Sequence, residues 1–274
     1  MKLTFVKPHA QLRPYIESLW VFESSFGFPA TDSSIAAPNG CPKLIIPYQN
    51  SLTSVADGRA SVSHPGKLYF VGNRDSSTSL HSTARATGFI AVEFSPAGAF
   101  PIFGIPMQAT SGGLWQTDQL LTKWSLKVQD ALENHPDVRT KVQIVQDALL
   151  RLLRSNGVRN DVVEHCVQVL KSRDGLVSVQ RLAQDTGYSR RHLNQLFHQN
   201  VGLAPKTLAG ILRFQKYYRW WAERKPYEAI RDAMYDHYYD ESHFHKEFKK
   251  MTGHAPGHFR RQITNEFGRR VTLR

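Results

Sequence analysis

The chain lacks several features that would place it in common protein classes. Its 274 residues include only two cysteines, Cys41 and Cys166, which lie far apart. This argues against a disulfide framework or a cysteine zinc site, and we expect two reduced thiols. No apolar run reaches the roughly 18 residues of a membrane span, and the N-terminus has no signal-peptide core. We therefore expect a cytoplasmic protein with no membrane partner.

Patterns typical of catalytic sites are also missing. Ser95 and Ser111 lack the context of a nucleophile elbow, and no glycine pattern indicates a phosphate-binding loop. His237, His243 and His245 lie near acidic residues, which suggests a metal site. However, His243 and His245 are two positions apart on an expected helix, so their side chains diverge. We expect no enzyme, no cofactor and no metal.

Acidic residues are scarce relative to basic ones. The chain has 35 Lys or Arg against 23 Asp or Glu, a net charge of +12. Residues 160–274 hold 20 basic and 12 acidic residues, so +8 of that excess lies in the C-terminal part. A basic surface is typical of a nucleic-acid partner, and equally of a protein whose charges are merely solvated.

The clearest positive feature is an internal repeat near the C-terminus. Five residues recur 51 positions later, so that Phe197, Gly202, Ala204, Pro205 and Leu208 correspond to Phe248, Gly253, Ala255, Pro256 and Phe259. Three upstream residues recur 50 positions later, so that Ala183, Gly187 and Tyr188 correspond to Ala233, His237 and Tyr238. Two copies of one small unit are therefore present.

Each copy has the pattern of a helix, a tight turn and a second helix. In the first copy Ser178 and Ser189 are expected helix caps, and Gly187 is expected to end the first helix. In the second copy Asp240 is the expected cap. The segment 205–221 between them predicts a helix of about 18 residues, roughly 27 Å long. Successive major-groove faces of DNA are about 34 Å apart, so two units on one rod can enter adjacent grooves.

These segments resemble the AraC/XylS family of transcription regulators, whose DNA-binding domain is a pair of helix-turn-helix units. The stretch VSVQRLAQDTGYSRRHLNQLF is similar to the first unit, and YYDESHFHKEFKKMTGHAPGHFRR to the signature of the second. The resemblance covers residues 160–262. The chain departs from the family pattern at His237, which replaces the usual turn glycine, and at Glu241, where Gln is commoner. A carboxylate only accepts hydrogen bonds, so Glu241 favours the cytosine amino group.

The resemblance implies roles for individual residues. Base contacts are expected from Arg191, Asn194 and Gln195 on the first recognition helix, and from Glu241, Ser242 and Lys246 on the second. Phosphate contacts are expected from Arg190, Lys206, Lys249 and Lys250. No effector-binding residue is assigned, although Trp20 and Trp115 are candidates for a pocket lining as well as for the core.

The N-terminal part has a different pattern. Apolar runs at 43–48, 68–71 and 89–94, broken by Pro, Gly, Asn and Ser, predict strands. Segments such as APNGCPKLIIPY resemble the N-terminal domain of one AraC-type subgroup, which implies a sensor role. Residues 117–155 predict two helices separated at Pro136, which either cover the sheet or carry a dimer contact. Ser155, Asn156 and Gly157 are expected to form a short link.

The expected fold class is α+β. We expect a strand-rich sensor-like domain over 1–113, a helical connector over 114–157, and over 158–274 an all-α domain with two helix-turn-helix units joined by a linker helix. The expected function is that of a sequence-specific DNA-binding transcription regulator. Its expected partners are double-stranded DNA and RNA polymerase, with a small-molecule effector and a homodimer left open. Two alternatives are a small-molecule-binding protein or enzyme with a nonspecific DNA anchor, and an architectural DNA binder.

Overall fold

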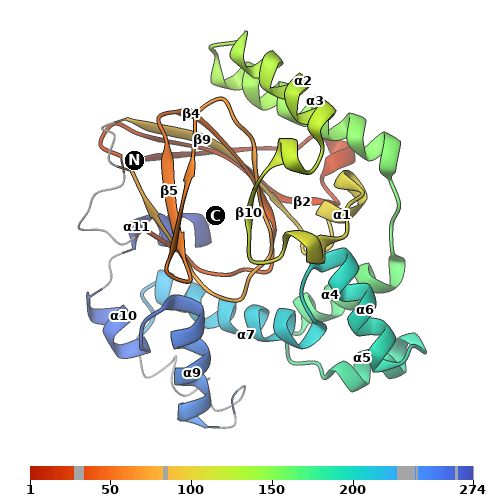
Figure 1. Cartoon of the computed structure of the whole chain (residues 1–274). Coiled ribbons are helices and arrows are strands. Elements are labelled where there is room, and N and C mark those ends of the chain that lie inside the picture. Colours follow the sequence, from red (N-terminus) through yellow and green to blue (C-terminus); the bar gives the residue numbers. More distant parts are fainter. Residues whose placement is uncertain (28–33, 83–85, 227–237, 239, 263–264, 274) are drawn as a thin grey trace.

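The computed structural model describes residues 1–27, 34–82, 86–226, 238, 240–262 and 265–273. Figure 1 shows a strand-rich N-terminal part, flanked by helices, and a C-terminal part built of helices. The expected α+β class is therefore confirmed. None of the described helices is both long enough and apolar enough to cross a membrane.

Two antiparallel sheets form the N-terminal part. The first has the order β1-β2-β9-β4-β7-β10, and the second has the order β3-β8-β5-β6. The strands are β1 Lys2–Val6, β2 Ile16–Ser24, β3 Ser34–Ala36, β4 Lys43–Gln49, β5 Leu52–Ala56, β6 Arg59–Ser63, β7 Tyr69–Val71, β8 Thr78–His81, β9 Thr87–Phe94 and β10 Leu114–Gln116. The three apolar runs that predict strands correspond to β4, β7 and β9, which are neighbours in the first sheet.

The strand register divides the first sheet into two faces. Leu19 lies opposite Val92 on one face, and one residue further along Trp20 lies opposite Ala91 on the other. Successive side chains of a strand point to opposite sides, so these two pairs cannot share a face. All eight residues of β9 are buried, which shows that both faces of the sheet are covered.

Two helices cover the face that carries Leu19. They are α2 Thr122–Glu133 and α3 Val138–Asn156, and Pro136 lies between them as expected. Their buried apolar residues share one core cluster with the sheet, formed by Val128, Leu132, Val142, Val145 and Leu149 together with Leu19, Leu44, Ile46, Ile90 and Val92. The helical pair thus covers the sheet, which is one of the two roles expected for residues 117–155.

The connection after α3 differs from the expected link. Ser155 and Asn156 are the last residues of α3, and the chain leaves the helix at Gly157 with φ 44°. Asn156 also donates a hydrogen bond to the carbonyl oxygen of Ile102 at 2.9 Å. The expectation of a three-residue link was wrong because glycine in the left-handed conformation ends a helix on its own.

The remaining helices are short except for one. They are α1 Ala99–Phe103, α4 Asp161–Ser172, α5 Val179–Thr186, α6 Arg190–Val201, α7 Pro205–Ala222, α9 Glu241–Thr252, α10 Pro256–Gln262 and α11 Glu266–Thr272, with the 3-10 helices η1 Ala10–Leu12, η2 Met107–Thr110 and η3 Thr117–Gln119. Figure 1 shows α4, α5 and α6 gathered at one end of α7, and α9 and α10 at the other.

The N-terminal and C-terminal parts share their apolar core. Ile35 of β3 belongs to the same buried cluster as Phe197 of α6 and Leu208 of α7. At the other edge of this contact, Phe267 of α11 packs with Trp20 of the first sheet. The C-terminal helices therefore dock on the strand-rich part instead of standing apart from it.

Candidate nucleic-acid interface

The first helix-turn-helix unit consists of α5 and α6. The Ser178 hydroxyl accepts from the backbone N–H of Arg181 at 3.1 Å and so caps α5. The Ser189 hydroxyl caps α6 in the same way, at 3.2 Å from the N–H of His192. Gly187 ends α5 with φ 72°, a conformation that glycine adopts without strain. The caps and the turn expected from the sequence are confirmed.

Burial fixes which side of α6 is presented to solvent. Leu193 and Phe197 are fully buried against the other helices. Helical periodicity then turns Arg191 and Gln195 outward, where both are exposed, while Asn194 is half-buried beside them. Arg190 and Arg191 make no ion pair with any described residue, so both guanidinium groups present their donors to solvent.

The second unit is described from Tyr238 onward, apart from residue 239. Asp240 caps α9 by accepting from the N–H of His243 at 2.7 Å. Phe244, Phe248 and Met251 form the buried stripe, as expected. The segment expected to form the first helix of this unit, with Ala229, Ile230, Ala233 and His237, lies outside the described residues.

The outward side of α9 carries the expected polar residues. Glu241, Ser242 and Lys246 are exposed, and so is Lys249 one turn further on. The Glu241 carboxylate lies 3.5 Å from Nε2 of His245, whereas His243 lies 3.7 Å from Glu247. The two histidines therefore face different carboxylates, and the described residues hold no group of metal ligands.

A half-buried ion pair joins α7 to α9. Arg213 of α7 contacts Glu247 of α9 at 3.1 Å and lies over the Tyr238 ring at 4.9 Å. Burial raises the pKa of the Tyr238 hydroxyl well above its ordinary value, and the Glu247 carboxylate adds to this shift. The phenol thus stays neutral, and α9 is fixed to α7 through charge as well as through its apolar stripe.

The structure also shows contacts that the sequence did not suggest. Asn73 donates to the carbonyl oxygen of Val201 at 2.8 Å, and Ser111 donates to that of Gly202 at 2.6 Å. Both carbonyl groups lie at the C-terminal end of α6, opposite the end that carries Arg190 and Arg191. Lys250 of α9 pairs with Asp75 at 2.5 Å. These partners lie more than 90 residues away in sequence, so no local pattern could indicate them.

Nine of the ten sequence-predicted site residues therefore fall into two groups on the surface. The α6 group holds Arg190, Arg191, Asn194 and Gln195, and the α9 group holds Glu241, Ser242, Lys246, Lys249 and Lys250. Lys206 is exposed on the first turn of α7, next to the end of α6. The structure brings the members of each group onto one helix face, and α7 separates the two faces (Figure 1).

A cavity of about 590 Å³ lies between the two sheets and reaches the C-terminal helices. Its lining includes Trp20 and Phe89 of the first sheet, Ile35 of the second, and Tyr218 and Phe267 of the helical part. Cavities of this volume are typical of small-molecule sites. Trp115, the other aromatic candidate, does not line it and donates its indole N–H to the carbonyl oxygen of Thr110 at 3.1 Å.

Two family models match the sequence. A helix-turn-helix domain matches residues 182–262, which include both α6 and α9. A domain of unknown function (DUF6597) matches residues 4–113, which hold the strands of both sheets except β10 and the start of β1. A sequence search of curated proteins finds no match.

Solved structures show a similar arrangement of both parts. ToxT from Vibrio cholerae superposes with a TM-score of 0.50 at 12% identity, covering 90% of this chain and 100% of that chain. ToxT from strain SCE256 with a bound unsaturated fatty acid gives a TM-score of 0.48 at 11% identity, covering 94% and 98%. The first likeness shows that the two proteins share a fold. The helix-turn-helix model covers most of the repeated segment, so the chain carries a helix-turn-helix domain in its C-terminal part.

Proposed function

We propose that α6 and α9 read adjacent major-groove segments of one operator. Base contacts come from Arg191, Asn194, Gln195, Glu241, Ser242 and Lys246. The observation that carries this proposal is that each helix buries an apolar stripe, at Leu193 and Phe197 or at Phe244 and Phe248, and leaves its polar side exposed. One continuous helix of 18 residues, α7, holds the two units. Arg prefers guanine, Gln and Asn prefer adenine, and Glu accepts from cytosine.

Phosphate contacts complete the proposed interface. Arg190, Lys206 and Lys249 are exposed and lie beside the base-reading residues. Lys250 differs from these three residues because its ammonium group already forms an ion pair with Asp75. This ion pair is half exposed, so it is weak enough for a DNA phosphate to replace. Lys250 therefore reaches DNA only after it leaves Asp75.

We propose domain boundaries at 1–113, 114–157 and 158–274, with regulation through the first domain. The cavity between the two sheets is the place where a small molecule can act on the helical part, because both parts line it. RNA polymerase is the proposed protein partner on DNA. Each chain carries both reading helices, so a homodimer is possible but is not required for binding one operator. The site of action is the cytoplasm, and the proposed role requires no catalytic step.

Two substitutions test this function with an operator selected from random DNA. Arg191→Ala removes a base contact, so discrimination between the operator and a single-base variant should fall by about 1–3 kcal/mol. Lys249→Ala should weaken binding to every sequence and reduce the salt slope by about one. Arg151→Ala, an exposed arginine on α3, is the matched control and should change neither quantity.

The result that contradicts the proposal is an unchanged base preference in Arg191→Ala. A competition with bulk DNA separates a specific regulator from a nonspecific anchor or an architectural binder. A specific site should win by about 10³-fold or more at fixed salt. Equal affinity for the operator and for bulk DNA would favour the two alternatives.

A further inference from the structure

A short segment of the N-terminal part reaches the ends of both α6 and α9. This segment, residues 72–77, joins β7 to β8. Asn73 donates to the carbonyl oxygen of Val201, the last residue of α6, at 2.8 Å. Two residues later, Asp75 pairs with Lys250 in the last turn of α9 at 2.5 Å. Two residues of extended chain span only about 7 Å, so the C-terminal ends of the two helices converge on this segment.

The internal repeat gives these two contacts corresponding positions. The residue after α6 is Gly202, with φ 77°, and the residue after α9 is Gly253, with φ 80°. These are the two glycines that recur at a distance of 51 residues in the sequence. The Ser77 hydroxyl also lies close to Gly253, 3.8 Å from the position that a Cβ atom would take there. The 72–77 segment therefore contacts the same end of both repeated units.

The segment is held in place by the N-terminal part itself. The Arg74 guanidinium donates to one carboxylate oxygen of Asp57 at 2.9 Å, and Ser76 donates to the other oxygen, also at 2.9 Å. Asp57 lies in the turn between β5 and β6. The residues on both sides of Asp75 are thus bound to one carboxylate. Asp75 is therefore presented to Lys250 by a fixed loop.

The two ends of the segment differ in burial. Asn73 is 5% exposed, and its hydrogen bond to α6 is buried. Breaking this bond leaves a buried amide and a buried carbonyl group without partners, which is unfavourable by roughly 5- to 150-fold. The side chains of Asp75 and Lys250 are 37% and 58% exposed. An exposed ion pair contributes about fivefold at most, so the Asp75 end is easily released and the Asn73 end is not.

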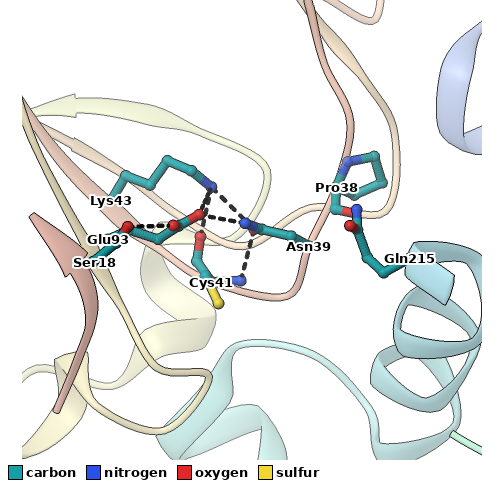
Figure 2. Close-up of polar contacts among 7 residues, drawn as sticks. All are labelled: Ser18, Pro38, Asn39, Cys41, Lys43, Glu93 and Gln215. Atoms are coloured by element: carbon teal, nitrogen blue, oxygen red, sulfur yellow. Dashed lines mark hydrogen bonds and ion pairs between the residues drawn. The ribbon is translucent and has the colours of Figure 1, made fainter. Parts of the chain in front are cut away.

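The N-terminal part also contacts α7, without using a residue proposed to bind DNA. Gln215 of α7 donates to the carbonyl oxygen of Pro38 at 2.6 Å, next to the hydrogen-bonded group around Asn39 (Figure 2). This contact holds the rod between the two units. The ion pair of Asp75 with Lys250 differs, because it occupies a side chain that is proposed to bind a phosphate.

We propose that the 72–77 segment is an autoinhibitory contact with one permanent and one releasable end. Asn73 keeps α6 attached to the N-terminal part, and Asp75 keeps the Lys250 ammonium group away from DNA until a phosphate replaces it. The two contacts of Lys250 exclude each other, so each weakens the other by the same factor. The proposal rests on the proposed function and specifies how the N-terminal part regulates it.

The segment also connects this contact to the cavity. Four of its residues belong to the cavity lining, namely Gly72, Asn73, Arg74 and Ser76. A change in the positions of Arg74 and Ser76 alters how Asp75 meets Lys250, because these two residues flank Asp75 in the chain. The segment therefore gives the cavity a route to α9 that requires no movement of α7.

The test measures the affinity of full-length variants for the operator selected from random DNA, by fluorescence anisotropy at fixed salt. Asp75→Asn should tighten binding by up to about fivefold, because an exposed ion pair contributes no more than this. In a Lys250→Gln background the same substitution should have no effect, since Asp75 acts through Lys250. Asp75→Glu keeps the carboxylate and should bind as the wild type. Asp130→Asn removes an exposed carboxylate from α2, so it is the matched control and should change nothing.

Asp57→Asn tests the support of the segment. In the described structure the Asp57 carboxylate bonds to Arg74 and Ser76, so its effect on DNA should pass through these two residues. Asp57→Asn should tighten operator binding by less than about fivefold, and it should add nothing in the Asp75→Asn background. Full additivity of the two substitutions would show that Asp57 does not position Asp75.

A measurement on the wild-type chain does not depend on the folding of a variant. Addition of the operator should shift the backbone ¹⁵N–¹H signals of Ser76 and Ser77, beside the released pair. The side-chain amide signal of Asn73 should stay in place. A shifted Asn73 amide signal would overturn the permanent end, and unshifted Ser76 and Ser77 signals would overturn the release of Asp75.

Equal tightening by Asp75→Asn in the wild-type and Lys250→Gln backgrounds would overturn the proposal, because Asp75 would then act on DNA through its charge alone. Unchanged or weaker binding in Asp75→Asn would overturn it as well. A chain that selects an operator and gives any of these results refutes this inference alone. A chain that selects no operator refutes the proposed function, and this inference with it.

Discussion

Asn265 should control whether the C-terminal helices stay docked on the strand-rich part. Its side chain is fully buried, and its amide donates to the Ile35 carbonyl oxygen at 2.9 Å and to the Tyr218 hydroxyl at 2.8 Å. Its carbonyl oxygen accepts from the N–H of Ile35 at 2.9 Å and from that of Gly268 at 3.2 Å. One side chain thus satisfies polar groups from β3, α7 and α11.

Asn265→Ala removes these four hydrogen bonds together. At about 1 kcal/mol of net stabilisation each, the loss is about 4 kcal/mol, or roughly a 10³-fold shift in the equilibrium between docked and open states. Alanine is also less suited than asparagine to the backbone at this position, where φ is 37°. Both effects act in the same direction, towards opening of α11.

Native-state hydrogen exchange measures this opening directly. The amides of β3 and α11 should lose protection by about three orders of magnitude in Asn265→Ala, whereas the centre of β9 should keep it. Asn50→Ala is the matched control, since Asn50 also has a positive φ, 61°, but lies exposed in the turn between β4 and β5. Unchanged protection of α11 in Asn265→Ala would refute the idea that this residue holds the two parts together.

Three further predictions concern stability and DNA affinity. Leu193→Ala should lower the free energy of unfolding by about 2–5 kcal/mol in chemical denaturation, and a loss below about 1 kcal/mol would contradict its place in the core. Asp75→Asn frees Lys250, so operator affinity should rise by no more than about fivefold; a fall in affinity would contradict the competition between Asp75 and phosphate. Burial and, secondarily, the charge of His258 lower the pKa of His254 in the folded protein. As the pH falls below about 6.5, the unfolded chain therefore becomes protonated at His254 before the folded chain does, and the free energy of unfolding decreases. Thermal melts between about pH 7.5 and 5.5 should show this slope, and His254→Gln should reduce it; an identical slope in the variant would exclude His254 as its source.

Local features of the C-terminal part could be predicted from the sequence. Ser178, Ser189 and Asp240 act as caps because a cap bonds to a backbone group only two or three residues away. The buried stripes of α6 and α9 follow from helical periodicity alone. For the same reason the exposed positions of Arg191 and Lys246 agree with the expected polar faces, while their contacts with DNA stay a prediction.

Features that depend on tertiary contacts could not be predicted in this way. Asn265 is separated from Ile35 by 230 residues, and nothing near either residue indicates that they meet. From the sequence Trp20 could be either a core residue or a pocket residue, and only the tertiary structure places it, 2% exposed, in an apolar cluster with Phe89 and Phe267. The state of Lys250 depended on Asp75, which the chain brings close only when the two parts dock.

The central claim is that one chain presents two reading helices on a single rod. Selection of bound DNA from a random pool, with the full-length protein at fixed salt, tests this claim most directly. We predict a motif with two half-sites about one helical turn apart, 10 to 10.5 base pairs between centres. Enrichment of a single half-site, or of no sequence at all, would contradict it.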